Sequence, residues 1–220
     1  MNIQPTKKQL DKAKEENVWT FGNNILYDLC KDNFKHSEDK HILTKVLFIG
    51  RIYAAAVERR TNKKEGINDH FYIDTIAPTF RKSKLDEHLL EIKKIKTLSI
   101  DNIKLILETH YYLTTILSKI TAQNKRSFSS KYLHFHLPEL FFIYDSRVLS
   151  SLRHFISKVP EELRQIIQSD NIDKDYATFY CKCFALKRQI EKQHKTTLTN
   201  RQFDNLLIEI ANRKKLEKQQ

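Results

Sequence analysis

The chain has 220 residues, of which 40% are hydrophobic and 30% charged, and its 39 basic and 27 acidic residues give a net charge of +12. A chain of this length can bury a sizeable core, and this composition excludes a disordered or membrane-embedded protein. The positive charge favours a polyanionic partner, either nucleic acid or an anionic membrane face.

Glycine and proline are scarce, with 3 and 4 residues respectively in the whole chain. Tight β-hairpins need glycine or Asn-Gly turns, and Rossmann and P-loop sites need glycine clusters around phosphates. Because neither pattern occurs, the sequence predicts a compact all-α protein of about eight to ten helices.

The chain has three cysteines, which are too few, and odd in number, for a disulfide framework. This small number favours a reducing compartment. The first residues carry charge but no apolar stretch, unlike a secretory signal. No apolar run approaches the roughly 18 to 20 residues of a membrane-spanning helix. We therefore expect a cytoplasmic protein without a membrane partner. The sequence does not determine the oligomeric state, and a monomer is favoured.

Apolar residues recur at helical spacing along most of the chain. Ser99 is expected to cap one helix, and the serine pair at 129–130 begins another that ends at Pro138. Asp145 or Ser146 begins the next. The expected helices cover residues 5–17, 23–30, 39–60, 69–76, 84–96, 100–121, 129–137, 145–159, 173–194 and 199–218, with a polar loop at 61–69.

No internal repeat or low-complexity segment divides the chain. The helices are expected to form one unit over residues 1–220, or two interlocked helical subdomains with a cleft between them. The basic C-terminal stretch NRKKLEKQQ is expected to be a solvated helix tail.

Arg51 lies among apolar neighbours within an expected helix, in FIGRIYAAAVERR. A charge in such a place must be paired or must face a cleft. Either Arg51 forms a buried ion pair between helices, or it contacts a phosphate or a base.

Two groups of potential metal ligands make poor metal sites. Cys181 and Cys183 lack the further pair of ligands that zinc needs, and three cysteines cannot build a four-cysteine iron–sulfur cluster. His134 and His136 lie on opposite sides of their expected helix, so one ion does not readily take both. We expect buried thiols, histidines used for packing or a substrate hydrogen bond, and no metal or cofactor.

Basic and aromatic side chains are interleaved between residues 125 and 132, where Lys125, Arg126 and Lys131 lie near Phe128 and Tyr132 in the sequence. This mixture suits a nucleic-acid strand whose backbone contacts cations and whose bases stack on aromatic rings. Aromatic residues in helices also form protein cores, and that alternative stays open.

The stretch SFSSKYLHFHLPELFFIYDSRVLSSL, residues 127–152, combines these features. It resembles the catalytic segment of the helix-hairpin-helix DNA glycosylases, the superfamily that includes the 8-oxoguanine glycosylases and endonuclease III. In that family a helix with a lysine near its start is followed by a loop. An apolar run then leads to an aspartate at the next helix N-terminus. Lys131 matches the lysine, and Asp145 matches the aspartate.

The resemblance implies a glycosylase-like fold and a DNA N-glycosylase, with or without lyase activity, that flips out and excises a modified base. The resemblance implies an oxidised base, and a modified base of phage DNA, in a defence role, is equally open as the substrate. Lys131 would be the amine nucleophile and Asp145 the carboxylate. The other candidate substrate-binding residues are Phe128, Tyr132, His134, His136 and Tyr144 around the base, and Arg51, Lys125 and Arg126 at phosphates.

The residue types agree with this chemistry. Base excision passes through a cationic sugar that a carboxylate such as Asp145 stabilises. A lysine attacks only when it is deprotonated, so Lys131 needs desolvation that lowers its pKa toward ~7–8. The alternative is a solvated Lys131 and an Asp145 that only caps a helix. The chain is then a non-catalytic DNA-binding helical protein, or a helical protein-interaction module.

Overall fold

The structure is a computed structural model that describes residues 4–59 and 70–217, with side chains up to residue 213. Within these ranges the chain forms eleven α-helices and one short π-helix, and no strand. The expected all-α class is confirmed, and the expected number of helices is slightly too low. The helices are α1 (Lys7–Lys14), α2 (Val18–Asp32), α3 (Asp39–Ile52), η1 (Phe71–Ile76), α4 (Ala77–Lys82), α5 (Leu85–Ile92), α6 (Ile100–Thr121), α7 (Arg126–His136), α8 (Ser146–Phe155), α9 (Glu161–Ile167), α10 (Lys174–His194) and α11 (Asn200–Glu217).

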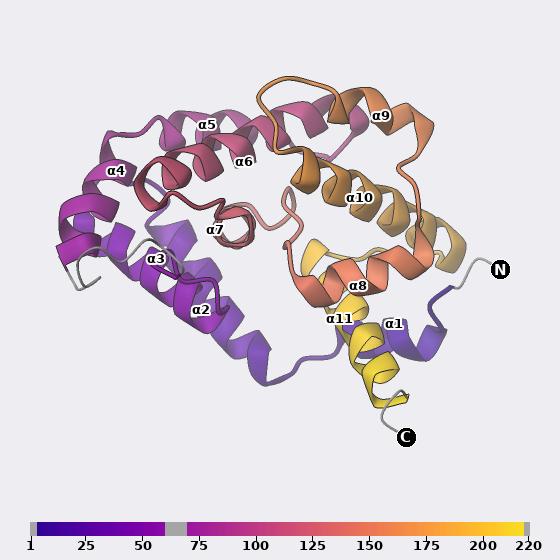
Figure 1. Ribbon diagram of the computed structural model, residues 1–220. Helices are drawn as coiled ribbons and strands as arrows, with labels where there is room; N and C mark the ends of the chain where they lie inside the picture. Colours follow the sequence, from indigo (N-terminus) through magenta and orange to yellow (C-terminus); the bar gives the residue numbers. More distant parts are fainter. Residues whose placement is uncertain (1–3, 60–69, 218–220) are drawn as a thin grey trace.

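Helix α7 lies at the centre of the molecule, where Figure 1 shows it nearly end-on. It packs against α2, α3 and α6, and it is buried from Phe128 to His136. Helix α11 packs against α8 and α1, so elements from the two ends of the chain lie together. One core cluster of buried side chains extends from Leu10 in α1 to Ile210 in α11.

Several helix starts follow the capping residues that the sequence predicts. The side chain of Asp145 accepts a hydrogen bond from the backbone N–H of Arg147 and caps α8. Ser99 precedes α6, and its backbone N–H donates to the Asn102 side chain at 3.1 Å. The expected cap in the serine pair at 129–130 is wrong, because α7 begins earlier, at Arg126, and both serines are buried inside it.

The helix expected over residues 39–60 is too long. Helix α3 ends at Ile52, and Ala54 takes a left-handed conformation with φ 50°. The backbone N–H of Ala55 donates to the carbonyl of Gly50 at 2.8 Å, which closes the helix end. Residues 53–59 therefore form turns, while residue 60 and the loop expected at 61–69 lie outside the described residues.

Two further elements differ from the expectation. The segment 71–76 is a π-helix that continues into α4, since the backbone N–H of Ala77 donates to the carbonyl of Tyr72. Helix α9 was not expected, although Pro160 and the acidic residues Glu161 and Glu162 at its start are ordinary helix-start signals.

A pair of glycine substitutions tests the closure of α3. Gly22→Ala should raise the free energy of unfolding by about 0.5–1 kcal/mol, because alanine loses less backbone entropy in a helix. The added Cβ meets nothing within 4 Å there. At Gly50 it would lie 3.1 Å from the Cα of Ala56, so Gly50→Ala should gain less or lose stability. Urea denaturation of both variants measures the difference, and equal stabilisation would contradict this account.

Candidate functional site

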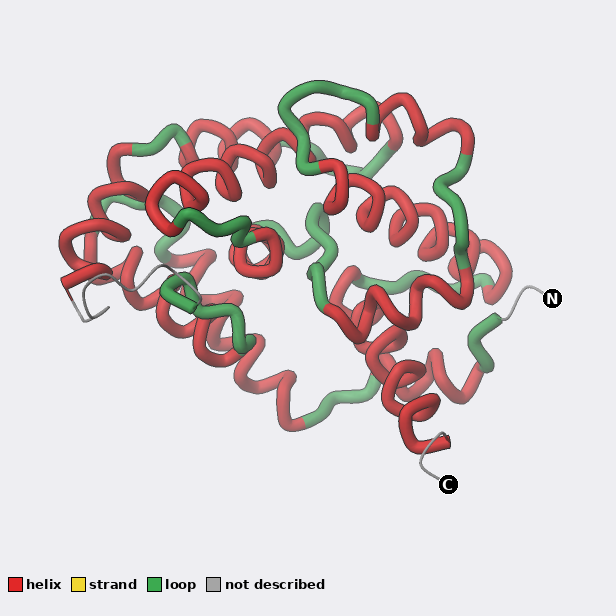
Figure 2. Tube along the Cα trace, viewed as in Figure 1, coloured by secondary structure: helices red, strands yellow, loops and turns green. Residues whose placement is uncertain are grey.

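The loop between α7 and α8 crosses the middle of the molecule, as Figure 2 shows. Its residues 140–143 are at most 4% exposed although they lie outside any helix. Buried carbonyls need hydrogen-bond donors, and side chains of α7, α10 and α11 supply them. Asn200 donates to Pro138 (3.0 Å) and Glu139 (2.9 Å), Tyr180 to Leu140 (2.6 Å), His134 to Phe141 (2.7 Å), and Tyr176 to Phe142 (2.8 Å).

Two serines of α7 hold the end of this loop against the helix. The backbone N–H of Tyr144 donates to Ser130 Oγ at 2.9 Å, and Ser127 Oγ donates to the Tyr144 carbonyl at 3.1 Å. These bonds fix the backbone that directly precedes Asp145. The position of Asp145 relative to α7, and therefore to Lys131, is set by the serines of the SFSSK motif.

Lys131 is buried, with 3% of its surface exposed, and its Nζ donates to Ser127 Oγ at 2.6 Å. It lies in the second turn of α7, so the alternative of a solvated first-turn lysine is wrong. Burial lowers the pKa of this amine, and the negative charges of Asp145 and Asp204 oppose the shift. Desolvation is the larger effect, so a larger fraction of Lys131 is in the neutral amine form than for a lysine on the surface.

Asp145 is held at the N-terminus of α8 through one of its two oxygens. Its Oδ1 accepts hydrogen bonds from the backbone N–H of Arg147 at 2.9 Å and from Arg147 Nε at 3.2 Å. The side chain is 21% exposed. The cap and the arginine together hold the carboxylate of Asp145 in one orientation.

Two adjacent cavities meet at these side chains. Cavity A has a volume of about 470 Å³ and cavity B about 490 Å³. Both are lined by Tyr53, Ala54, Lys131 and Asp145. The structure thus brings the predicted amine and the predicted carboxylate together at the junction of two spaces, each within the size range of small-molecule sites.

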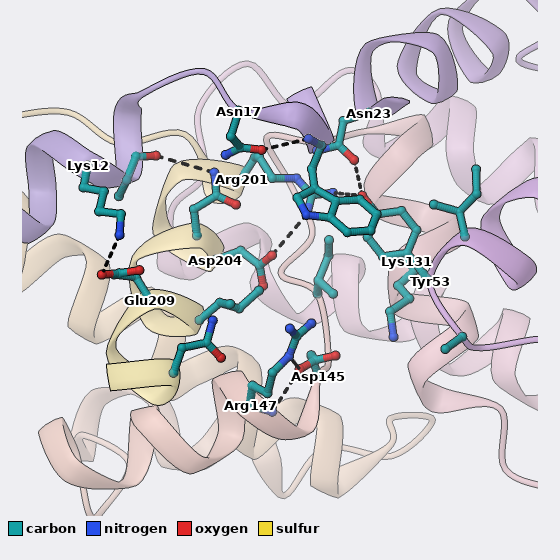
Figure 3. A pocket seen from close by; sticks show the side chains of 18 residues that line it. Lys12, Asn17, Asn23, Tyr53, Lys131, Asp145, Arg147, Arg201, Asp204 and Glu209 are labelled. Atoms are coloured by element: carbon teal, nitrogen blue, oxygen red, sulfur yellow. Dashed lines mark hydrogen bonds and ion pairs between the residues drawn. The ribbon is translucent and has the colours of Figure 1, made fainter. Parts of the chain in front are cut away.

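Cavity A contains a buried ion pair that sequence reasoning missed. Arg201 and Asp204 of α11 pair at 3.1 Å, and Figure 3 shows them around the same cavity as Lys131, Asp145 and Arg147. Burial raises the pKa of Asp204 to about 6, although Arg201 lowers it. The guanidinium of Arg201 also donates to the hydroxyls of Tyr27 at 3.1 Å and Tyr53 at 3.2 Å.

The missed pair had a readable signal. Asp204 follows Phe203 and lies one turn before Leu207 and two turns before Ala211, on the apolar side of a helix that was expected from the sequence. A carboxylate there needs a partner or a cavity.

Tyr132, His134 and His136, expected around the base, lie in the core and line neither cavity. The Tyr132 hydroxyl bonds His36 Nε2 at 2.7 Å. His134 links the Phe141 carbonyl to Tyr27, whose hydroxyl lies 2.8 Å from its Nε2. His136 links the Tyr132 carbonyl to Lys45 Nζ. Their ring nitrogens and hydroxyl are used within the protein.

The cations expected at phosphates have different environments. Arg51 pairs with Glu58 at 2.6 Å, and its side chain is 66% exposed, so this ion pair is not the buried one considered. Arg126 pairs with Asp173 at 2.7 Å and Asp175 at 2.9 Å, which ties α7 to the start of α10. Lys125 lines cavity B and donates to the carbonyl of Arg59 at 2.5 Å.

Cavity B also contains two of the predicted aromatic residues. Phe128 and Tyr144 line it, together with Ser127 and Lys125. The ring of Tyr144 lies 5.3 Å from the guanidinium carbon of Arg126, within cation–π distance. Cavity B therefore combines basic and aromatic side chains beside Lys131.

The three cysteines are buried and free, as expected. Among the described residues, no group of three or more His, Cys, Asp or Glu side chains is arranged to hold a metal ion. In the same part of the chain, no helix has the length and apolarity to cross a membrane.

No protein-family model matches the chain, and no curated protein or solved structure matches it significantly.

The buried histidines predict a loss of stability in acid. Burial lowers the pKa of His36, His110, His134 and His136, to about 3 for His110 and His134. The unfolded chain then binds more protons below its ordinary histidine pKa, so stability present above pH ~6.5 is lost as pH falls. Each such histidine lowers the free energy of unfolding by up to about 1.4 kcal/mol for each pH unit of acidification. The raised pKa of Asp204 has the opposite effect and offsets part of this loss.

Urea denaturation at pH 7.5 and 5.0 measures the loss. His110→Phe keeps a ring stacked on Tyr176, whose centroid lies 3.6 Å away, and removes one titrating group. This variant should lose less stability between the two pH values than the wild type. Unchanged or higher stability of the wild type at pH 5.0 would contradict the prediction.

Proposed function

We propose that the protein is a DNA glycosylase that takes an extruded modified base and cleaves its bond to the sugar C1′. The observation that carries this proposal is the junction of the two cavities, where a buried lysine amine and a capped aspartate line the same spaces. The expected substrates are an oxidised base, which the sequence resemblance implies, or a modified base of phage DNA, which is equally open.

The chemistry follows from the two groups. When the bond between C1′ and the base breaks, its electron pair leaves with the base and positive charge develops on the sugar. The carboxylate of Asp145 stabilises that charge, and in a water-poor site such stabilisation contributes several kcal/mol. The neutral amine of Lys131, or a water molecule, then forms a bond to C1′ and loses a proton, and the departed base takes up that proton.

A duplex cannot deliver a base into either cavity while the base is stacked, so the nucleotide must be turned out of the helix. The net charge of +12 supports binding to the phosphate backbone. Arg59 and Lys125 line cavity B together with Lys131 and Asp145, and they are the cations proposed to contact the phosphates. Arg51 and Arg126 are ion-paired with carboxylates, so they are less available to phosphates.

Asp145→Asn separates the charge of this residue from its capping role. Asparagine caps helices about as well as aspartate does, so α8 should persist. Release of the modified base should fall by about 100-fold or more, because the stabilising charge is gone, while DNA binding is retained. Alkaline cleavage of a panel of modified duplexes measures release. The control Asp101→Asn removes an exposed aspartate of α6 and should leave release unchanged.

Wild-type base release in a folded, DNA-bound Asp145→Asn protein would sink the assignment. Binding of DNA without base release from any duplex in the wild type would leave the non-catalytic DNA-binding alternative.

Lys131→Gln tests the covalent step. If the amine attacks C1′, borohydride should trap an adduct of wild-type protein and DNA, and Lys131→Gln should abolish it. Lys12→Gln is the matched control, because Lys12 lines cavity A but is 52% exposed and pairs with Glu209. An adduct that persists in Lys131→Gln would assign the nucleophile to another residue, and base release without any adduct would assign the attack to water.

A further inference from the structure

Asp204 has an unsatisfied oxygen at the wall of cavity A. The residue is 4% exposed and lines the cavity, and its Oδ2 pairs with Arg201. Its Oδ1 is buried and has no hydrogen-bond partner among the described residues. A buried acceptor left without a partner costs about 1–3 kcal/mol, and such exceptions in folded proteins call for a physical reason. A ligand that occupies the adjoining cavity and donates a hydrogen bond to Oδ1 is such a reason.

Three of the four Lys and Arg side chains that line cavity A are paired with carboxylates, and the fourth, Lys131, donates to Ser127 Oγ. Lys12 pairs with Glu209 at 3.0 Å and Arg147 with Asp145 at 3.2 Å, in addition to Arg201 with Asp204. Because each of these cations is neutralised by a carboxylate, the cavity offers little to a phosphate. A neutral ligand that donates hydrogen bonds suits it better.

Aromatic surface is present in the same cavity. Trp19 is 64% exposed and lines cavity A, as does Tyr53. Tyr53 is held in place by Asn23, whose side-chain oxygen accepts from its hydroxyl, and by the guanidinium of Arg201, 5.5 Å from its ring. Indole and phenol faces bind planar rings by stacking.

We propose that cavity A binds a neutral nucleobase that presents a ring N–H, with Asp204 Oδ1 as the acceptor and Trp19 as the stacking surface. The proposal rests on the function proposed above and names its substrate class, a base with a donor edge. It also assigns a different part of the nucleotide to each of the two cavities. Cavity A takes the base, and cavity B, with Arg59 and Lys125, lies toward the sugar and its phosphates.

The state of Asp204 at neutral pH agrees with an acceptor. Burial and the charge of Asp145 raise its pKa, to about 6, while Arg201, Lys131 and Arg147 lower it. At pH 7.5 most molecules therefore carry the anion. Hydrogen bonds to a charged acceptor are stronger than neutral ones.

Trp19 is the only tryptophan of the chain, so its fluorescence reports occupation of cavity A directly. Wild-type protein at pH 7.5 is titrated with guanosine and uridine, and with 1-methylguanosine and 3-methyluridine, which lack the ring N–H. We expect at least one parent nucleoside to quench the fluorescence saturably. Its methylated counterpart should bind about 10-fold more weakly or worse. Quenching by none of the four, or equal binding of parent and methylated forms, would overturn the proposal.

Asp204→Asn should reduce the discrimination between parent and methylated nucleoside toward one. Arginine only donates hydrogen bonds, so the amide oxygen of this variant should turn to Arg201 and leave an NH₂ group at the position of Oδ1. Asp101→Asn is the control, because it makes the same change at an exposed aspartate of α6 that does not line cavity A; it should keep the wild-type discrimination. Full discrimination in a folded Asp204→Asn protein would remove Asp204 from the site. If that variant fails to fold, the wild-type titrations decide.

These titrations need no catalysis and no DNA, so they fail independently of the proposed function. Discrimination between the nucleosides without base release from any duplex would retain the ring site and remove the glycosylase. Base release from duplexes without discrimination between the nucleosides would retain the glycosylase and remove the proposed ring site.

Discussion

The hydrogen bonding of the loop at residues 138–144, which is buried at 140–143, is the constraint on which the site depends. A backbone outside helices cannot satisfy its own carbonyls, and each one left without a donor in the core would cost about 1–3 kcal/mol. Side chains such as His134, Tyr176 and Tyr180 provide the donors, which fixes α7, α10 and α11 around the loop. The same bonds deliver Asp145 to the edge of the cavities. Stability of the core and geometry of the site therefore have one physical origin.

The charges around the cavities form one coupled group. Burial lowers the pKa of Lys131 and raises that of Asp204, so desolvation disfavours the charged form of both. The carboxylates of Asp145 and Asp204 favour a protonated Lys131, whereas Arg147 and Arg201 favour the neutral amine. Removing any one of these charges changes the balance for the others. The buried pair of Arg201 and Asp204 thus acts on the chemistry even where it does not touch the reacting atoms.

Local sequence patterns predict the helices and their caps. They do not predict which side chains contact each other across long separations in the sequence. Helix 100–121 and the cap at Asp145 follow from spacing and capping alone. The turn at Ala54 could not be read, since it depends on the close approach of Gly50 and Ala56. His134 was assigned to the base pocket because its bond to Tyr27, 107 residues away in sequence, leaves no local pattern. The juxtaposition of Lys131 and Asp145 was reached through the family resemblance, which the helix pattern by itself does not supply.

The capping role and the proposed catalytic role of Asp145 are compatible. Both hydrogen bonds from Arg147 fall on Oδ1, and among the described residues Oδ2 receives none. The cap therefore uses one oxygen to orient the side chain and leaves the other for charge that develops in the cavity. A helix N-terminus also favours the anion without a mobile counterion. A residue that begins a helix is for this reason a suitable place for a preorganised carboxylate, and its capping bond is part of what orients it.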